Sequence, residues 1–170
     1  EGYLWVGTWG GGLARFNGEG FTTYQVGDGL PANRIEELLV DRAGVLWVAT
    51  TLGLAAWRDH RLEPVDLGFP GGVRVRALAE DAAGQLWVGT DRGVLVLDAA
   101  GARPRPAAET EPLVYDLLVE PEGVLAVTDQ GLFRFVVGDE VEALPGPPTP
   151  SGTLRAAVRT GDGLWAVSYT

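Results

Sequence analysis

Few residues in this chain are of the types that catalysis requires. Its only histidine is His60, which lies in the polar stretch Arg58–Arg61, and it has no cysteine. Neither Ser151 nor Ser168 lies in the Gly-x-Ser-x-Gly context of a nucleophile elbow. We expect His60 to be an exposed loop residue, because no second histidine or thiol stands at a metal-ligand spacing from it. The sequence therefore predicts no catalytic residue, no metal site and no cofactor.

The charge balance excludes several classes of partner. The 170 residues include 13 Lys and Arg against 23 Asp and Glu, for a net charge of −10. A protein that binds nucleic acid or anionic lipid normally presents a basic face, so neither partner is expected. No apolar run approaches the roughly 18 residues that span a bilayer, and we expect no direct membrane insertion. Because the chain has no methionine, we expect it to be part of a longer protein.

The chain contains a repeated sequence pattern. It is marked by an aromatic or leucine residue three positions before a Thr or Ser, at Trp5, Trp47, Trp87, Leu125 and Trp165. The intervals are 42, 40, 38 and 40 residues, and each period holds four short apolar runs separated by Gly, Asp and Pro. Period-two alternation favours strands. The sequence predicts an all-β fold without helices, a β-propeller of four-stranded antiparallel blades of about 40 residues.

We expect about four blades, which would form part of the ring of a larger propeller. The third blade has only a weak outer run, near Pro104–Ala108. The predicted boundaries are 1–26 for blade one from its second strand, 33–67, 73–108 and 113–144 for blades two to four, and 153–170 for the first two strands of a fifth.

The turns and the tryptophans have separate physical roles. In the turns Asp41–Gly44 and Asp81–Gly84, we expect the aspartate to accept backbone hydrogen bonds and the glycine to adopt positive φ. The repeated tryptophans are expected to pack between blades, since an indole buries roughly 150–250 Å². The alternative is that the repeated tryptophans form an aromatic platform that binds a sugar.

Blade four departs from the pattern, with Leu125 in place of Trp and Ala126 in place of Val. If Asp129 and Gln130 form a two-residue turn, Ala126 lies opposite Phe133. The larger Phe133 would then replace lost volume, as close packing requires.

A family resemblance follows from the segment Gly29–Ile35 (GLPANRI), from Leu46–Thr50 (LWVAT), from Gly53-Leu54 and from Phe21–Tyr24. The chain resembles the two-component regulator propeller repeat over nearly its whole length, most clearly in blades one to three. The resemblance implies a periplasmic or extracellular sensor domain of a membrane-anchored bacterial signalling protein. Such a domain would pass ligand occupancy to a separate output domain without catalysing a reaction.

Binding residues are expected on loops that a scaffold holds in place. The loops that join one blade to the next are 27–33, 68–72, 107–113 and 145–153, and the tips of the hairpins should lie on the same side. The candidates for ligand binding are Trp9, Asn33, Arg34, Phe69, Arg74 and Arg92. The alternative is that Asn33 caps a turn and that the arginines form a solvated rim. The expected partners are a glycan or small molecule, and the remaining blades of a parent propeller or a second copy of the chain.

Two other functions remain open. One is a scaffold propeller for protein–protein assembly. The other is a glycan-cleaving, sialidase-like propeller or a lyase of the streptogramin-inactivating type. A sialidase needs an arginine cluster, and Arg34, Arg74 and Arg155 recur near the starts of three expected first strands.

Overall fold

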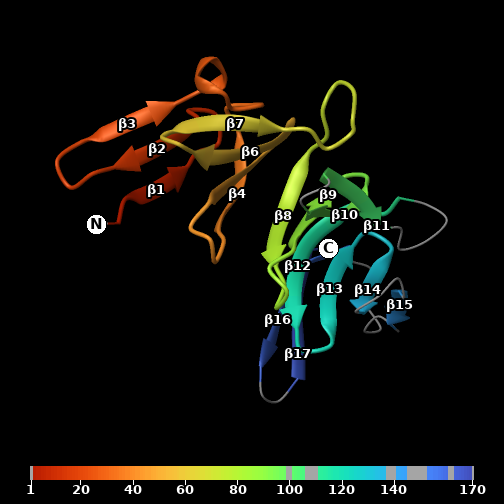
Figure 1. Ribbon diagram of the computed structural model, residues 1–170. Coiled ribbons are helices and arrows are strands. Elements are labelled where there is room, and N and C mark those ends of the chain that lie inside the picture. The colour runs from red at the N-terminus through yellow and green to blue at the C-terminus, as the bar shows by residue number, and fades with distance from the viewer. Residues whose placement is uncertain are drawn as a thin grey trace. The chain divides into compact units, whose positions relative to one another are not determined.

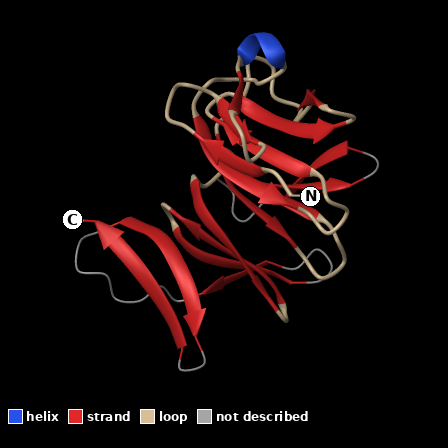
Figure 2. Cartoon of the chain, turned by 90° about the vertical axis from the view of Figure 1, so that its left-hand side faces the viewer, coloured by secondary structure: helices blue, strands red, loops and turns tan. Residues whose placement is uncertain are grey.

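The computed structural model describes residues 2–98, 101–105, 111–136, 141–144, 153–160 and 163–169, without the side chains of 153–155 and 164–169. The chain divides into two compact units, Glu1–Arg76 and Ala77–Thr170. Both consist of antiparallel sheets in which strands adjacent in sequence pair through short turns (Figures 1 and 2).

The first unit holds two sheets. One has three strands in the order β1-β2-β3, and the other has four in the order β4-β5-β6-β7. Their bounds are β1 Leu4–Gly7, β2 Leu13–Phe16, β3 Phe21–Tyr24, β4 Ile35–Val40, β5 Leu46–Thr50, β6 Gly53–Arg58 and β7 Arg61–Val65.

The second unit holds two four-stranded sheets and one hairpin. The strands are β8 Val75–Glu80 (which starts at the end of the first unit), β9 Leu86–Thr90, β10 Gly93–Asp98, β11 Gly101–Arg105, β12 Val114–Glu120, β13 Gly123–Thr128, β14 Gly131–Val136, β15 Val141–Leu144, β16 Thr153–Thr160 and β17 Gly163–Tyr169. The meandering four-stranded sheets are the blades of a β-propeller, as the repeat predicts.

The secondary structure differs from the sequence prediction in two places. A single 3-10 turn, Val26–Asp28, is the one helical element of the described residues, where no helix was expected. The outer strand of blade three is β11, Gly101–Arg105, which begins three residues before the run expected near Pro104–Ala108. Residues 99–100 and 106–110 lie outside the described part of the chain. The prediction followed hydropathy, whereas an outer strand pairs on one side only and needs few apolar residues.

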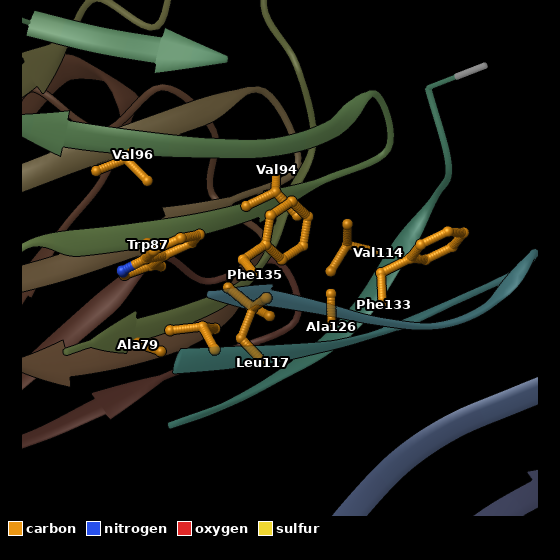
Figure 3. Packing of buried hydrophobic residues seen from close by; sticks show 11 residues of the cluster. Ala79, Trp87, Val94, Val96, Val114, Leu117, Ala126, Phe133 and Phe135 are labelled. Carbon is orange, nitrogen blue, oxygen red and sulfur yellow. The ribbon is translucent and has the colours of Figure 1, made fainter. Parts of the chain in front are cut away.

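Adjacent blades pack closely because the second strand carries a small residue two positions after its tryptophan. A Cβ on Gly89 would lie 2.6 Å from Cγ1 of Val114 on the next blade, and a Cβ on Gly7 would lie 2.6 Å from Cγ2 of Ile35. Around Gly89, Trp87 packs with buried residues of β8, β10, β12, β13 and β14 (Figure 3). The tryptophan therefore supplies the volume of the interblade core.

The Asp turns form as predicted and have one further role. Oδ1 of Asp81 accepts hydrogen bonds of 2.9 Å from the backbone N–H groups of Ala83 and Gln85, and Gly84 has φ +79°. Oδ2 of Asp81 accepts a 2.8 Å hydrogen bond from Nε1 of Trp87. The same indole-to-carboxylate bond joins Trp47 to Asp41. Each turn is thus fixed to the tryptophan six residues later.

Blade four lacks both the tryptophan and the turn aspartate of this bond. Gly123 directly follows the short Pro121-Glu122 turn there, and Leu125 holds the tryptophan position, fully buried. The register places Ala126 opposite Phe133, so the predicted pairing is confirmed.

Candidate functional site

An exposed tryptophan and an ion-paired trio lie together where blade one meets blade two. We call Trp9, Arg34, Glu36 and Arg74 the Trp9 cluster. Trp9 and Arg34 form an isolated antiparallel bridge, and the guanidinium carbon of Arg34 lies 4.5 Å from the centre of the indole ring. Trp9 is 82% exposed, so most of its surface is open to a ligand.

Backbone hydrogen bonds hold Trp9 in place. Thr8 Oγ1 donates to the carbonyl of Gly12 at 2.7 Å, which closes the β1–β2 tip. Gly12 has φ +88°, and a Cβ there would collide with the carbonyl oxygen of Tyr24. The tip then joins the next blade, because Ile35 N donates to Thr8 O at 2.9 Å and Gly12 N donates to Asn33 O at 2.9 Å. Trp9 therefore sits on a tip that the neighbouring blade fixes.

Glu36 joins the two arginines of the cluster. Arg74 Nη2 lies 2.9 and 2.8 Å from the two carboxylate oxygens of Glu36, and Arg34 Nε lies 3.0 Å from Oε1. The Glu36 side chain is only 13% exposed. Two cations share one carboxylate, so the cluster has a net charge of +1 and suits an anionic group.

Sequence reasoning identified the two arginines and missed their common partner. Arg34 and Glu36 are two residues apart at the start of a strand and so face the same side. That two-residue spacing was the signal in the sequence that could have identified Glu36 as the partner of Arg34. The approach of Arg74 from the next blade depends on packing that the repeat alone does not fix.

Asn33 has a structural role beside the cluster. Its Oδ1 accepts a 2.9 Å hydrogen bond from Val26 N, at the start of the 3-10 turn, while its carbonyl holds Gly12. The Asn33 side-chain oxygen is thus engaged within the blade, as the turn-capping alternative expects, and ligand binding by Asn33 stays a prediction.

The other two predicted residues are Phe69 of the first unit and Arg92 of the second. Phe69 lines a separate cavity of about 160 Å³ with Leu52, Leu67 and Val73. Arg92 lies at the β9–β10 tip of the second unit, where its N–H donates to Thr90 Oγ1 at 2.9 Å. Ligand binding by either stays a prediction. Of the other predicted loops, 145–152 and most of 107–113 lie outside the described residues, as does the side chain of Arg155.

His60 lies in a turn, as expected. Asp59 and His60 have φ of 47° and 64°, values that a tight two-residue hairpin turn requires, and His60 is exposed. Among the described residues, no group of three His, Cys, Asp or Glu side chains is placed to hold a metal ion. None of the described helices is long and apolar enough to cross a bilayer.

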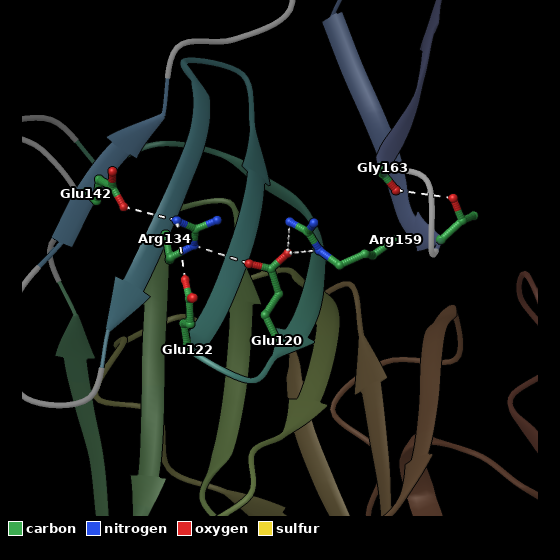
Figure 4. Close-up of polar contacts among 7 residues, drawn as sticks. Glu120, Glu122, Arg134, Glu142, Arg159 and Gly163 are labelled. Carbon is green, nitrogen blue, oxygen red and sulfur yellow. Dashed lines mark hydrogen bonds and ion pairs between the residues drawn. The ribbon is translucent and has the colours of Figure 1, made fainter.

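A second polar network joins blade four to the hairpin β16–β17 (Figure 4). The Glu120 side chain, 4% exposed, accepts from Arg134 Nε at 3.2 Å and from Arg159 Nε at 2.6 Å. Asp116 accepts from the N–H groups of Ala157 at 3.1 Å and Leu117 at 2.9 Å. Burial raises the pKa of the Asp116 carboxyl above its ordinary value, against the opposing effect of these two N–H donors. The network is structural, since the oxygens of both carboxylates are occupied by protein donors.

Comparison with known proteins agrees with this fold. The model of the two component regulator propeller family matches residues 29–51 and 68–92, a narrower extent than the predicted resemblance. No curated protein matches the sequence.

Solved structures share the fold at low identity. The extracellular domain of the hybrid two component system BT4673 from B. thetaiotaomicron matches with a TM-score of 0.81 and 19% identity, over 96% of this chain and 24% of that one. Virginiamycin B lyase from Staphylococcus aureus matches with a TM-score of 0.73 and 16% identity, over 98% and 59%. An ancestral GH74 enzyme matches with a TM-score of 0.71 and 14% identity, over 98% and 26%. The chain thus spans about a quarter of the length of the extracellular domain that it matches.

Proposed function

Since this chain carries two component regulator propeller repeats, we propose that it is a non-enzymatic sensory segment that binds an anionic glycan or a similar small anionic ligand. In this proposal a separate output domain of the same signalling protein responds to the occupied propeller. The blades would lie in the periplasm or outside the cell, as in the extracellular domain that they resemble.

The single observation that carries the proposal is the open indole of Trp9 next to Arg34, which shares the Glu36 carboxylate with Arg74. A sugar ring packs its C–H face on an aromatic ring, and a carboxylate or sulfate pairs with guanidinium. Arg34 lies over the indole at 4.5 Å, and Arg74 is fixed 2.8 Å from Glu36. A ligand on Trp9 would therefore meet a preformed cationic edge. Preorganisation of this kind lowers the entropic cost of binding.

Further blades or a second copy are the proposed protein partners. β1 is an edge strand with one neighbour, β2. Leu4 and Val6 are exposed on it, and Tyr3 is exposed directly before it. An exposed apolar edge is a ready site for pairing with another strand. Analytical ultracentrifugation of the chain tests this proposal, and a species that stays monomeric at all concentrations, alone and with the rest of the propeller, argues against it.

An enzymatic role is the second candidate, because two propellers with the same fold are enzymes. The described residues favour binding over catalysis. Glu36 is the only acid of the Trp9 cluster, and its carboxylate is engaged by two arginines. General acid–base catalysis needs a group within hydrogen-bond reach of the reacting proton.

A glycan array with acidic and neutral oligosaccharides tests the proposed function. We expect binding to acidic members, loss of that binding in Trp9→Ala, and unchanged binding in Phe21→Ala. Phe21 is a suitable control because it is also an exposed aromatic residue, at the outer strand of the same blade. Turnover of a glycan would favour the enzymatic candidate, and absence of binding to every member would contradict the proposal.

A further inference from the structure

The outer strand of blade one, β3, is an open edge of its sheet. It pairs with β2 alone and lies on the side of the sheet away from β1 (Figure 1). Phe21, Thr22 and Thr23 are exposed on it, and Tyr24 is partly buried. All four residues are aromatic or β-branched, the types that favour strands, and none is charged. An open edge of this composition is a template for pairing with another strand.

The β2–β3 hairpin shows which backbone groups of this edge face outward. Asn17 N donates to Gly20 O at 3.2 Å, so the residues that flank the turn form a hydrogen-bonded pair. Such pairs alternate with non-hydrogen-bonded pairs along an antiparallel ladder, and the next pair is Phe16 with Phe21. Their rings lie 4.8 Å apart, as expected where side chains approach most closely. The N–H and C=O groups of Phe21, and of Thr23 two residues later, therefore point away from β2.

Blades two and three carry a proline at the corresponding position of their outer strands. Thr23 of β3, Pro64 of β7 and Pro104 of β11 are equivalent, because the residue that each faces lies in turn opposite the valine that follows the repeated tryptophan. A proline has no N–H to donate and hinders the approach of a further strand to a sheet edge. Blade one has an open N–H where two other blades have none.

The preceding position is charged in every other outer strand that the structure describes. Glu63 of β7, Arg103 of β11 and Glu142 of β15 correspond to Thr22, because each pairs with the residue that lies opposite the tryptophan position of its blade. Charged side chains on an edge strand oppose pairing with another strand. Of the four described outer strands, only β3 has neither the charge nor the proline.

We propose that β3 pairs antiparallel with β3 of a second copy of this chain, about a two-fold axis at Thr22. In this register Phe21 of each copy lies opposite Thr23 of the other, and the two residues exchange their outward N–H···O=C bonds. Thr22 lies opposite its own counterpart in a non-hydrogen-bonded pair. Aromatic–β-branched and Thr–Thr pairs are both favourable across strands. The contact is isologous, so it closes as a dimer.

The strand fits itself better than it fits the other outer strands of the chain. Residues opposite one another in an antiparallel pair must both face outward or both face inward, and the two-fold register meets that condition with no charges opposed. The strands β7, β11 and β15 would each bring a charge to the ladder, and the first two would also bring a proline. Because β3 has only four residues, we expect a weak dimer with a Kd of about 100 µM.

Sedimentation equilibrium of the full chain over a range of concentrations measures this association. Thr23→Pro introduces the residue of blades two and three, removes the outward N–H and should raise the Kd at least about tenfold. Thr22→Glu places like charges opposite one another at the axis and should have a similar effect. Val40→Glu is the control, because it adds the same charge at an exposed position of β4, and should associate as the parent does.

Disulfide formation locates the contact, since the chain has no cysteine of its own. The Cα atoms of a non-hydrogen-bonded antiparallel pair lie about 4.5 Å apart, within the range of a disulfide. Thr22→Cys should therefore form a covalent dimer under mild oxidation, and adding Thr23→Pro to it should prevent this. Glu63→Cys is the matched control, because it places a thiol at the same register position on an edge that carries Pro64.

Three results would overturn the proposal: no association of the parent chain, an unchanged Kd in Thr23→Pro, or equal crosslinking of Thr22→Cys and Glu63→Cys. Unchanged melting temperatures show that the variants fold. Pairing through β1 would survive every substitution on β3, so the two edges of the sheet are tested separately. Trp9→Ala should associate as the parent does, and failure of this proposal would leave the glycan site unaffected.

Discussion

Nε1 of Trp87 donates a 2.8 Å hydrogen bond to Oδ2 of Asp81, six residues earlier, and Trp47 makes the same bond to Asp41. The bond joins the turn at the start of a hairpin to the side chain that packs between blades. It also satisfies the one polar atom of a nearly buried indole. The turn and the interblade core are therefore stabilised together.

Replacing Asp81 by Ala should lower the free energy of unfolding by about 1–3 kcal/mol, because the indole N–H and the turn N–H groups lose their acceptor. Asp91→Ala is the control, since Asp91 is exposed at the next hairpin tip. Urea unfolding of both variants measures the difference. Equal stability of the two would show that the bond contributes nothing.

Replacing Gly89 by Ala should destabilise the protein by about 1–3 kcal/mol through overpacking. The new Cβ would lie 2.6 Å from Val114 Cγ1 and 3.2 Å from Ala77 Cβ. Gly20→Ala is the matched control, because nothing lies within 4 Å of a Cβ at that position. Thermal unfolding followed by circular dichroism distinguishes them, and a Gly89→Ala protein as stable as the control would refute the close approach of blades.

Restoring the repeat residue in blade four, Leu125→Trp, should also lower stability. Leu125 is fully buried among Val127 and Leu132, and the indole would lack the aspartate that its counterparts use. We expect a loss of about 1–3 kcal/mol, read from the melting temperature. A clear rise in melting temperature would mean that blade four retains space for the tryptophan.

The pH dependence of stability should include a contribution from Asp116. Burial raises the pKa of this carboxyl above its ordinary value of 3.8, so the folded protein binds its proton more tightly than the unfolded chain does. The resulting stabilisation is fully present below the unfolded pKa and is lost as the pH rises through the folded pKa.

The variant Asp116→Asn should therefore show a smaller loss of melting temperature than the parent as the pH is raised from about 4 towards neutrality. Asp91→Asn serves as the exposed control and should follow the parent. Parallel curves for parent and Asp116→Asn would contradict this origin of the pH dependence.

Much of the fold follows from local sequence, including the packing of Trp87 between blades, whereas the polar contacts between blades do not. Period-two alternation and Gly/Asp turns locate most strands, and the pairing of Ala126 with Phe133 follows from a two-residue turn. The start of the outer strand β11 was predicted three residues too late, because its sequence, Gly-Ala-Arg-Pro-Arg, has little apolar character. Trp9, Arg34 and Arg74 were found as candidates. Glu36 was missed because its role depends on Arg74, 38 residues away.

Calorimetric titration of an acidic oligosaccharide from the array into the parent chain, Trp9→Ala and Phe21→Ala tests the sensory account most directly. The account predicts a loss of affinity of at least about tenfold in Trp9→Ala, with Phe21→Ala unchanged. Equal affinity in all three proteins would place the ligand away from the Trp9 cluster and contradict the account.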